Sequence, residues 1–241
     1  GRSLLMLALV IDTAGSTGGV LLVRYDVAAK KTGETEVLGK SVLPPREFST
    51  QLISAIAELL QANQLVLPAV DAFAVVSGPG SFTGLRVGLS AIKAMAEVTA
   101  KPVIAVSRLA IMASMAEGFD GLVHAVLDAG RGEFYHGAYC DAGEEYVAES
   151  LETLESLAAT FNRTPGLVVA SEPDVLAALS AVPGVAPRQI PYATVREALP
   201  LVLTAWQARR FTDVALLDAN YLHRINPGIV SKASADPQPS D

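Results

Sequence analysis

The stretch DAFAVVSGPGSFTGLRVGLSAIKAMAEV, residues 71–98, decides the fold. Its apolar run at 70–77 predicts a buried strand, and the apolar spacing over 83–98 predicts a helix. The glycine-rich turn between them resembles the strand–loop–helix arrangement with which proteins hold phosphate groups. However, the turn lacks the Gly-Lys-Ser/Thr ending of a P-loop and the third glycine of a dinucleotide fingerprint. We therefore interpret it as a tight strand-to-helix connection.

The elements around this stretch predict an α/β fold in which one order of elements occurs twice. In the first half we expect strands at 7–14, 19–26, 35–43, 70–77 and 101–107, with helices at 47–63, 83–98 and 108–119. The second half starts again with a hairpin around Gly130-Arg131-Gly132, followed by EYVAES, LETLESLAATFN, GLVVAS, PDVLAALS and a long helix at 194–210. This repetition predicts two domains, each a mixed sheet flanked by helices.

The predicted boundaries place a first domain at 6–107 and a second, smaller one at 108–194. The segment 195–225 is expected to pack back on the first domain. We expect residues 226–241 to form a disordered tail, because they are polar and poor in apolar side chains. Residues 1–5 precede a methionine, which favours a short non-native extension.

Composition narrows the class of function. The 241 residues are 51% hydrophobic and 18% charged, which is typical of a well-packed globular protein. A net charge of −7 argues against a dedicated nucleic-acid surface. No apolar stretch is long enough to cross a bilayer, and the one cysteine allows no internal disulfide. We expect a cytoplasmic protein without a membrane anchor.

The sequence offers no catalytic constellation. Three histidines lie far apart without HxxxH spacing, so no metal site is predicted. His124 and His136 stand on the two arms of one predicted hairpin and face each other only in one register. Ordinary strand histidines are favoured over zinc ligands. Cys140 has no neighbouring base, and no G-x-S-x-G elbow occurs.

Two aspartates leave nucleotide binding open. Asp12, in IDTAGSTGGV, and Asp128, in LDAGRGEF, each end a strand at a hairpin turn. Actin-like ATPases and sugar kinases hold Mg-ATP between two domains with such paired motifs. Asp12 and Asp128 would then be the nucleotide-facing carboxylates. In the other interpretation each aspartate only caps its own turn, as short acceptors often do.

VSGPGSFTGLRVGLSAIKAMA, followed by KPVIAVSRLAIMA, closely resembles the bacterial TsaB (YeaZ) family of tRNA threonylcarbamoyladenosine biosynthesis proteins. LALVIDTAGSTGGVLL, VLDAGRGEFYHGAY and DANYLHRI resemble that family's beginning, middle and end. The resemblance implies two RNase H-like/actin-like (ASKHA) domains. It also implies a non-catalytic subunit, because the catalytic paralogue TsaD carries a metal-binding HxxxH in the helix that corresponds to 47–63, which has no histidine here.

The same resemblance implies the partners. The family supports a TsaD-type enzyme, together with a TsaE-type ATPase, in transferring a threonylcarbamoyl group to the anticodon-adjacent adenosine of ANN-decoding tRNAs. A chain of this kind would contact tRNA only indirectly and form a homodimer when alone. No cofactor is expected, although ATP or ADP at a subunit interface stays open. Where many members read Asp-Ala-Arg-Arg-Gly, this chain has Gly130, which keeps a Mg-ATP-dependent enzyme of the actin and sugar-kinase type as the alternative function.

Helices 47–63 and 83–98 are the predicted docking elements. The first has apolar residues on two adjoining sides, and the second carries small residues at helical spacing, which lets another backbone come close. The other interpretation is that both helices are covered by their own domain. The predicted partner-facing residues are Leu52, Ile53, Ile56, Leu60, Thr83, Arg86, Val87, Gly88, Ser90, Ala91 and Ala94.

Overall fold

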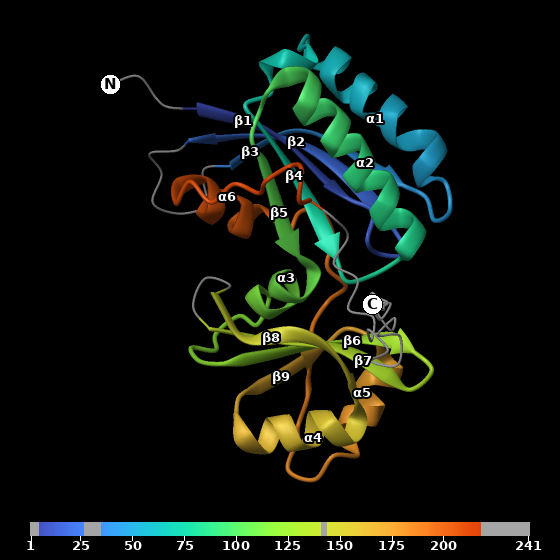
Figure 1. The fold of residues 1–241 in the computed structure, drawn as a ribbon, viewed down its shortest axis with the longest axis vertical. Helices are drawn as coiled ribbons and strands as arrows, with labels where there is room; N and C mark the ends of the chain where they lie inside the picture. The colour runs from blue at the N-terminus through green and yellow to red at the C-terminus, as the bar shows by residue number, and fades with distance from the viewer. Residues whose placement is uncertain (1–4, 27–34, 141–143, 218–241) are drawn as a thin grey trace, which may run out of the picture.

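The computed structural model describes residues 5–26, 35–140 and 144–217, and it contains two five-stranded mixed sheets (Figure 1). The first sheet has the order β3-β2-β1-β4-β5, and the second has β8-β7-β6-β9-β10. Both therefore follow one pattern, with the third, second, first, fourth and fifth strands of each half side by side. The predicted α/β class and its doubled order are confirmed. The predicted tail at 226–241 and all but Leu5 of the predicted extension lie outside the described residues.

The first sheet is built around strand β1, which lies between an antiparallel and a parallel neighbour. Every residue of β1 after Leu5 is buried, because helices cover both faces of this sheet. β2 and β3 extend the antiparallel side, and β4 and β5 the parallel side. The strands are β1 (Leu5–Asp12), β2 (Gly18–Asp26), β3 (Thr35–Leu43), β4 (Ala72–Gly78) and β5 (Val103–Ser107).

Helices α1 (Phe48–Ala62) and α2 (Phe82–Thr99) lie side by side over one face of this sheet, and a 3₁₀ turn, η2 (Leu67–Ala69), connects α1 to β4 (Figure 1). Helix α6 (Leu199–Gln207) covers the other face beside β5. Its Val202 and Leu203 are buried in the core of the first sheet. Pro200 sits in the first turn of α6, where a missing N–H is tolerated, so this helix is shorter than the predicted 194–210.

The second sheet carries its helices on the outer face, away from the first sheet (Figure 1). The predicted helix over LETLESLAATFN begins only at Leu154, because β8 continues to Thr153 and the Thr153 hydroxyl caps the helix by accepting the Ser156 N–H at 3.2 Å. The two-residue β10 was not predicted. The elements are β6 (Val123–Gly130), β7 (Glu133–Cys140), β8 (Glu144–Thr153), α4 (Leu154–Arg163), β9 (Leu167–Ala170), α5 (Pro173–Ser180) and β10 (Arg188–Gln189).

Helix α3 (Arg108–Ser114) lies between the two sheets. The Ser107 hydroxyl caps it by accepting the Leu109 N–H at 3.0 Å, and the same hydroxyl donates to the Glu149 carboxylate on β8. The Tyr139 hydroxyl of β7 donates to that carboxylate as well. This network fixes the end of β5 to the second sheet. We call β1–β5 with α1, α2 and α6 the first lobe, and β6–β10 with α4 and α5 the second lobe.

Candidate functional site

The glycine-rich loop between β4 and α2 is fastened to the turn that follows β1. The Ser81 N–H donates to the Ala14 carbonyl oxygen at 2.8 Å, and the Ser81 hydroxyl caps α2 by accepting the Gly84 N–H at 3.2 Å. A Cβ on Gly80 would overlap the Ala14 carbonyl oxygen, and one on Gly84 would overlap the Thr13 carbonyl oxygen. The glycines therefore let the start of α2 pack against the turn of its own sheet, as expected of a strand-to-helix connection.

Four of the predicted partner-facing residues lie inside the first lobe. A Cβ on Gly88 would overlap the Thr13 hydroxyl oxygen, so the space beside this glycine is filled by a side chain of its own domain. Leu52, Ile56 and Leu60 are only 1%, 4% and 7% exposed, because they pack on the sheet beneath α1. Because their own domain covers these four residues, we leave them out of the proposed contact surface.

The other predicted partner-facing residues lie at the surface of the two helices. The exposed ones are Ile53, Thr83, Arg86, Ser90 and Ala94, and Val87 and Ala91 are half-buried. Ile53 is 60% exposed and Val98, one turn beyond Ala94, is 82% exposed. Sequence reasoning missed Val98, although its i+4 spacing from Ala94 was visible. We define the outward face as the exposed residues Ser49, Ile53, Ala57, Arg86, Ser90, Ala94 and Val98.

Small and apolar side chains dominate this outward face. The residues of this face recur at every fourth position, three of them on α1 and four on α2. This spacing places the residues of each helix along one side of that helix. Arg86 adds a charge, and its guanidinium carbon lies 3.8 Å from the centre of the Phe82 ring, so a cation–π contact holds it against the helix. An exposed strip without long, mobile side chains is suited to close packing by another helix.

Asp12 and Asp128 occupy equivalent positions at the ends of β1 and β6, and each caps its own turn. One oxygen of Asp12 accepts the Ala14 N–H at 2.8 Å, and one oxygen of Asp128 accepts the Gly130 N–H at 3.0 Å. Asp12 is buried, and burial raises the pKa of its carboxyl, whereas Asp128 is exposed. Within 5–26, 35–140 and 144–217, no group of three or more His, Cys, Asp or Glu side chains is placed to hold a metal ion. This geometry supports the turn-capping interpretation of both aspartates.

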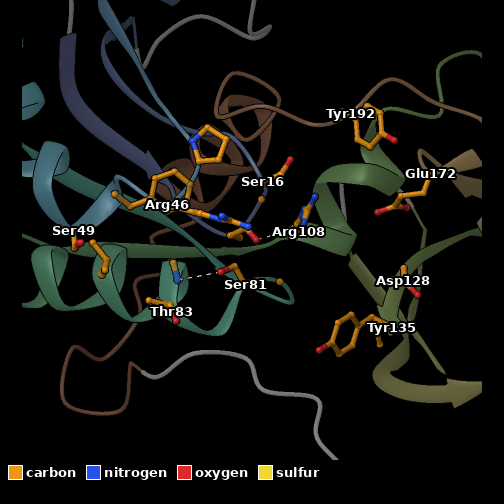
Figure 2. Close-up of a pocket in the computed structure, with 18 residues that line it drawn as sticks. Ser16, Arg46, Ser49, Ser81, Thr83, Arg108, Asp128, Tyr135, Glu172 and Tyr192 are labelled. Atoms are coloured by element: carbon orange, nitrogen blue, oxygen red, sulfur yellow. Dashed lines mark hydrogen bonds between the residues drawn. The ribbon is translucent and has the colours of Figure 1, made fainter. Parts of the chain in front are cut away.

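A cleft of about 950 Å³ lies between the two lobes. Figure 2 shows Arg46 pointing into it from the start of α1 and Arg108 at the start of α3, with Asp128, Tyr135 and Glu172 on the second-lobe wall. Asp128 lines this cleft, but Asp12 does not. Of the charged residues in the cleft, only Asp128 was expected from sequence, because the four come from separate segments.

The Glu172 side chain is half-buried in the wall of the cleft. Its Oε2 is inaccessible to solvent and has no hydrogen-bond partner within the described ranges. Burial raises the pKa of the Glu172 carboxyl, while the nearby Arg108 guanidinium opposes that rise. The Arg108 guanidinium also approaches the Ala14 carbonyl oxygen at 3.5 Å. Arg108 therefore links the first-lobe turn electrostatically to the second-lobe wall.

His124 and His136 do face each other, within the core of the second lobe. His124 Nε2 lies 2.7 Å from the Thr164 carbonyl oxygen, which can only accept, so this nitrogen carries the proton. His124 Nδ1 then accepts from His136 Nε2 at 2.9 Å. His136 Nδ1 is left buried and without a partner among the described residues. Burial lowers the pKa of both imidazoles, that of His136 to about 4, so the pair is neutral at pH 7.

The family model for TsaD, the tRNA N6-adenosine threonylcarbamoyltransferase, matches residues 38–189, more than half of the chain. The protein TsaB of Bacillus subtilis, named for tRNA threonylcarbamoyladenosine biosynthesis, is 32% identical over 134 residues, which cover 56% of this chain and 55% of that protein. The matched stretch thus spans about half of the length of that relative. An uncharacterised protein of Mycobacterium tuberculosis is 35% identical over 182 residues, covering 74% of this chain and 78% of that protein.

A crystal structure from Pseudomonas aeruginosa, described as an uncharacterised protein with similarity to the peptidase YeaZ, shares the fold with a TM-score of 0.68 at 25% identity. It is matched over its whole length and covers 90% of this chain. This likeness confirms the expected pair of actin-like domains. Among the described residues, no helix is both long and apolar enough to traverse a bilayer. The chain belongs to the TsaD family, and within that family it is similar to the members named TsaB and YeaZ.

Proposed function

We propose that this protein is an accessory, non-catalytic subunit of tRNA threonylcarbamoyladenosine biosynthesis, in which it binds and supports a TsaD-type transferase. A TsaE-type ATPase completes the assembly, and tRNA is contacted only indirectly. In the absence of the transferase, the same surface pairs two copies of this chain in a homodimer. The relatives named TsaB support the pathway, and the outward face of α1 and α2 is the observation that supports the role.

The outward face supports docking because it leaves apolar surface unburied on an otherwise closed core. Ile53 and Val98 are 60% and 82% exposed on helices whose inner sides are fully packed. The small residues Ser90 and Ala94 on α2 have little side-chain entropy to lose on binding. A second pair of helices could therefore lie against α1 and α2 at short distance.

The non-catalytic role is supported by the structural hydrogen bonds of the aspartates and histidines that are candidates for catalysis. Asp12 and Asp128 cap turns, and His124 and His136 are closed into one hydrogen-bonded pair in a core. Helix α1 has no histidine to provide the HxxxH pair. The alternative, a self-sufficient Mg-ATP-dependent enzyme, needs carboxylates that face the cleft, and Asp12 does not line it. We therefore rank that alternative second.

Charged substitutions on the outward face should separate docking from folding. Ile53→Arg and Ala94→Arg each place a guanidinium in the proposed contact without disturbing the core, since both positions are exposed. We expect each change to weaken binding to the TsaD-type subunit at least about 30-fold, the effect of losing an interface centre. Calorimetry measures the affinity, and a reconstituted tRNA reaction should lose its threonylcarbamoyl product in parallel.

Ala177→Arg is the matched control, because Ala177 is exposed on helix α5 of the second lobe. This variant should bind and support the reaction within about twofold of the unchanged chain, since a surface substitution away from the contact has little effect. Sedimentation of the free chain should show a dimer that Ile53→Arg and Ala94→Arg dissociate. Wild-type affinity in both folded outward-face variants would contradict the proposed contact.

A further inference from the structure

The cleft between the lobes has separated positive and negative walls. Arg46 and Arg108 contribute two positive charges from the starts of α1 and α3, and Asp128 and Glu172 contribute two negative charges from the second lobe (Figure 2). The only side-chain ion pairs within the described ranges are Arg24–Glu36 and Lys101–Asp71. The four charges of the cleft thus face a shared volume of about 950 Å³ without closing into direct pairs.

One oxygen among these charged groups has no hydrogen-bond partner among the described residues. Glu172 Oε2 is sealed from solvent and has no hydrogen-bond donor among the described residues. A buried polar atom without a partner is unfavourable, so each such atom needs an explanation. The residue as a whole is only half-buried and lines the cleft, so a small shift of its side chain would bring this oxygen to a donor held in the cleft.

The balance of charge argues against a Mg-nucleotide as the occupant. A triphosphate would bring several negative charges to a site where two arginines already face two carboxylates. The aspartate that would help to hold Mg²⁺ on the first lobe, Asp12, is buried in its own turn with one oxygen on the Ala14 N–H. A ligand with one pole of each sign and no net charge matches the two walls.

We propose that this cleft binds a small zwitterion of the α-amino acid class. Its carboxylate would lie between the guanidinium groups of Arg46 and Arg108, and its ammonium group would donate to Glu172 and Asp128. The rings of Tyr135 and Tyr192, which also line the cleft, would contact the ligand's side chain. This ligand site borders the outward face at Ser49, which lines the cleft as well, and its existence does not depend on the accessory role.

Ligand binding to the full chain tests the proposal directly. The probes are the twenty standard amino acids, each assayed by calorimetry and by thermal shift, with Mg-ATP and Mg-ADP as the contrasting ligands. We expect saturable binding of one amino acid or a few related ones. N-acetylation or amidation of the bound amino acid should each weaken binding more than about tenfold, because each removes one charge-assisted contact.

Two conservative variants locate the site. Arg46→Gln and Glu172→Gln should each weaken amino-acid binding more than about tenfold. The exposed Arg209→Gln and Glu155→Gln serve as matched controls and should bind as the unchanged chain does. Circular dichroism and the melting temperature of each unliganded variant show whether it has folded, and Glu172→Gln alone decides the question if the Arg46 variant does not fold.

Several results would overturn the proposal. Absence of binding by all twenty amino acids would do so, as would unchanged binding by folded Glu172→Gln. Stronger binding of Mg-ATP than of any amino acid, abolished by Asp128→Ala, would replace the zwitterion with a nucleotide. None of these results bears on docking to the transferase, which the Ile53 and Ala94 variants test separately.

Discussion

The turn after β1 and the turn after β6 hold equivalent places in the two lobes, and they use glycine for different reasons. Glycines around the first turn, Gly80 and Gly84, allow close backbone contact, because added Cβ atoms there would overlap Thr13 and Ala14. Gly130 and Gly132 in the second turn have φ of 79° and 78°, with open space where a Cβ would stand. One topology thus yields a tightly packed turn in the first lobe and a turn with open space around its glycines in the second.

Replacing Gly84, which packs on the first turn from helix α2, and Gly132, which lies in the second turn, should expose this difference most strongly. Gly84→Ala forces a methyl group into the Thr13 carbonyl oxygen, and neither backbone can move freely, so we expect a loss of about 3 kcal/mol in unfolding free energy. Gly132→Ala meets no atom and pays only the strain of a positive φ, about 1 kcal/mol. Urea denaturation of both variants measures the two values, and equal losses would contradict the distinction.

The second lobe alone carries the buried histidine pair, so it should be the acid-sensitive half. Burial holds the pKa of His136 at about 4 in the folded chain, below the ordinary value of 6.5. The unfolded chain therefore binds more protons between these values. Stability should fall as the pH drops from about 6.5 to about 4, by about 1.4 kcal/mol per pH unit for each proton taken up.

His136→Gln tests this pH dependence, because glutamine keeps a donor towards His124 Nδ1 but does not titrate. Urea unfolding at a series of pH values between 4 and 7 should show a shallower slope for the variant than for the unchanged chain. The charge of the nearby Glu152 carboxylate acts in the opposite sense and raises the pKa of His136, but burial outweighs it. An unchanged slope would show that the histidine pair does not govern acid stability.

Removing the charge of each turn-capping aspartate should change the melting temperature by different amounts. Asp12 is buried and burial raises the pKa of its carboxyl, so the ionised form is disfavoured in the folded state. Asp12→Asn keeps an acceptor for the Ala14 N–H and removes the charge. We expect a gain of about 1 kcal/mol at pH 7, a rise of roughly 2–4 °C in melting temperature. Asp128→Asn, at an exposed site, should change the melting temperature by less than about 1 °C.

Much of this fold follows from local sequence patterns. The hairpin-led repeat predicted both sheets, because alternating apolar runs and glycine turns are local signals. The helix boundaries at Thr153 and Leu199 were harder to place, since strand pairing and a proline decided them. The sequence pattern did not show which side of α1 packs on the sheet. Leu52 and Ile53 are both apolar neighbours, and only the position of the sheet decides that Leu52 is buried and Ile53 exposed.

The candidate cleft lay beyond sequence reasoning. Arg46, Arg108, Asp128 and Glu172 follow one another at intervals of 20 to 62 positions, and only Asp128 belongs to a recognised motif. Only the placement of one lobe against the other brings them to one cavity. The paired aspartates, by contrast, were found from sequence, but the pattern could not say that Asp12 would be buried within its turn.

Hydrogen exchange of the full chain, with and without the TsaD-type subunit, tests the central proposal most directly. Amide exchange should slow on binding in α1 and α2, above all around Ile53 and from Ser90 to Val98, because docking would cover these exposed residues. Exchange in α4 and α5 should not change. Slowed exchange confined to the second lobe, with α1 and α2 unaffected, would contradict the assignment of the outward face as the docking surface.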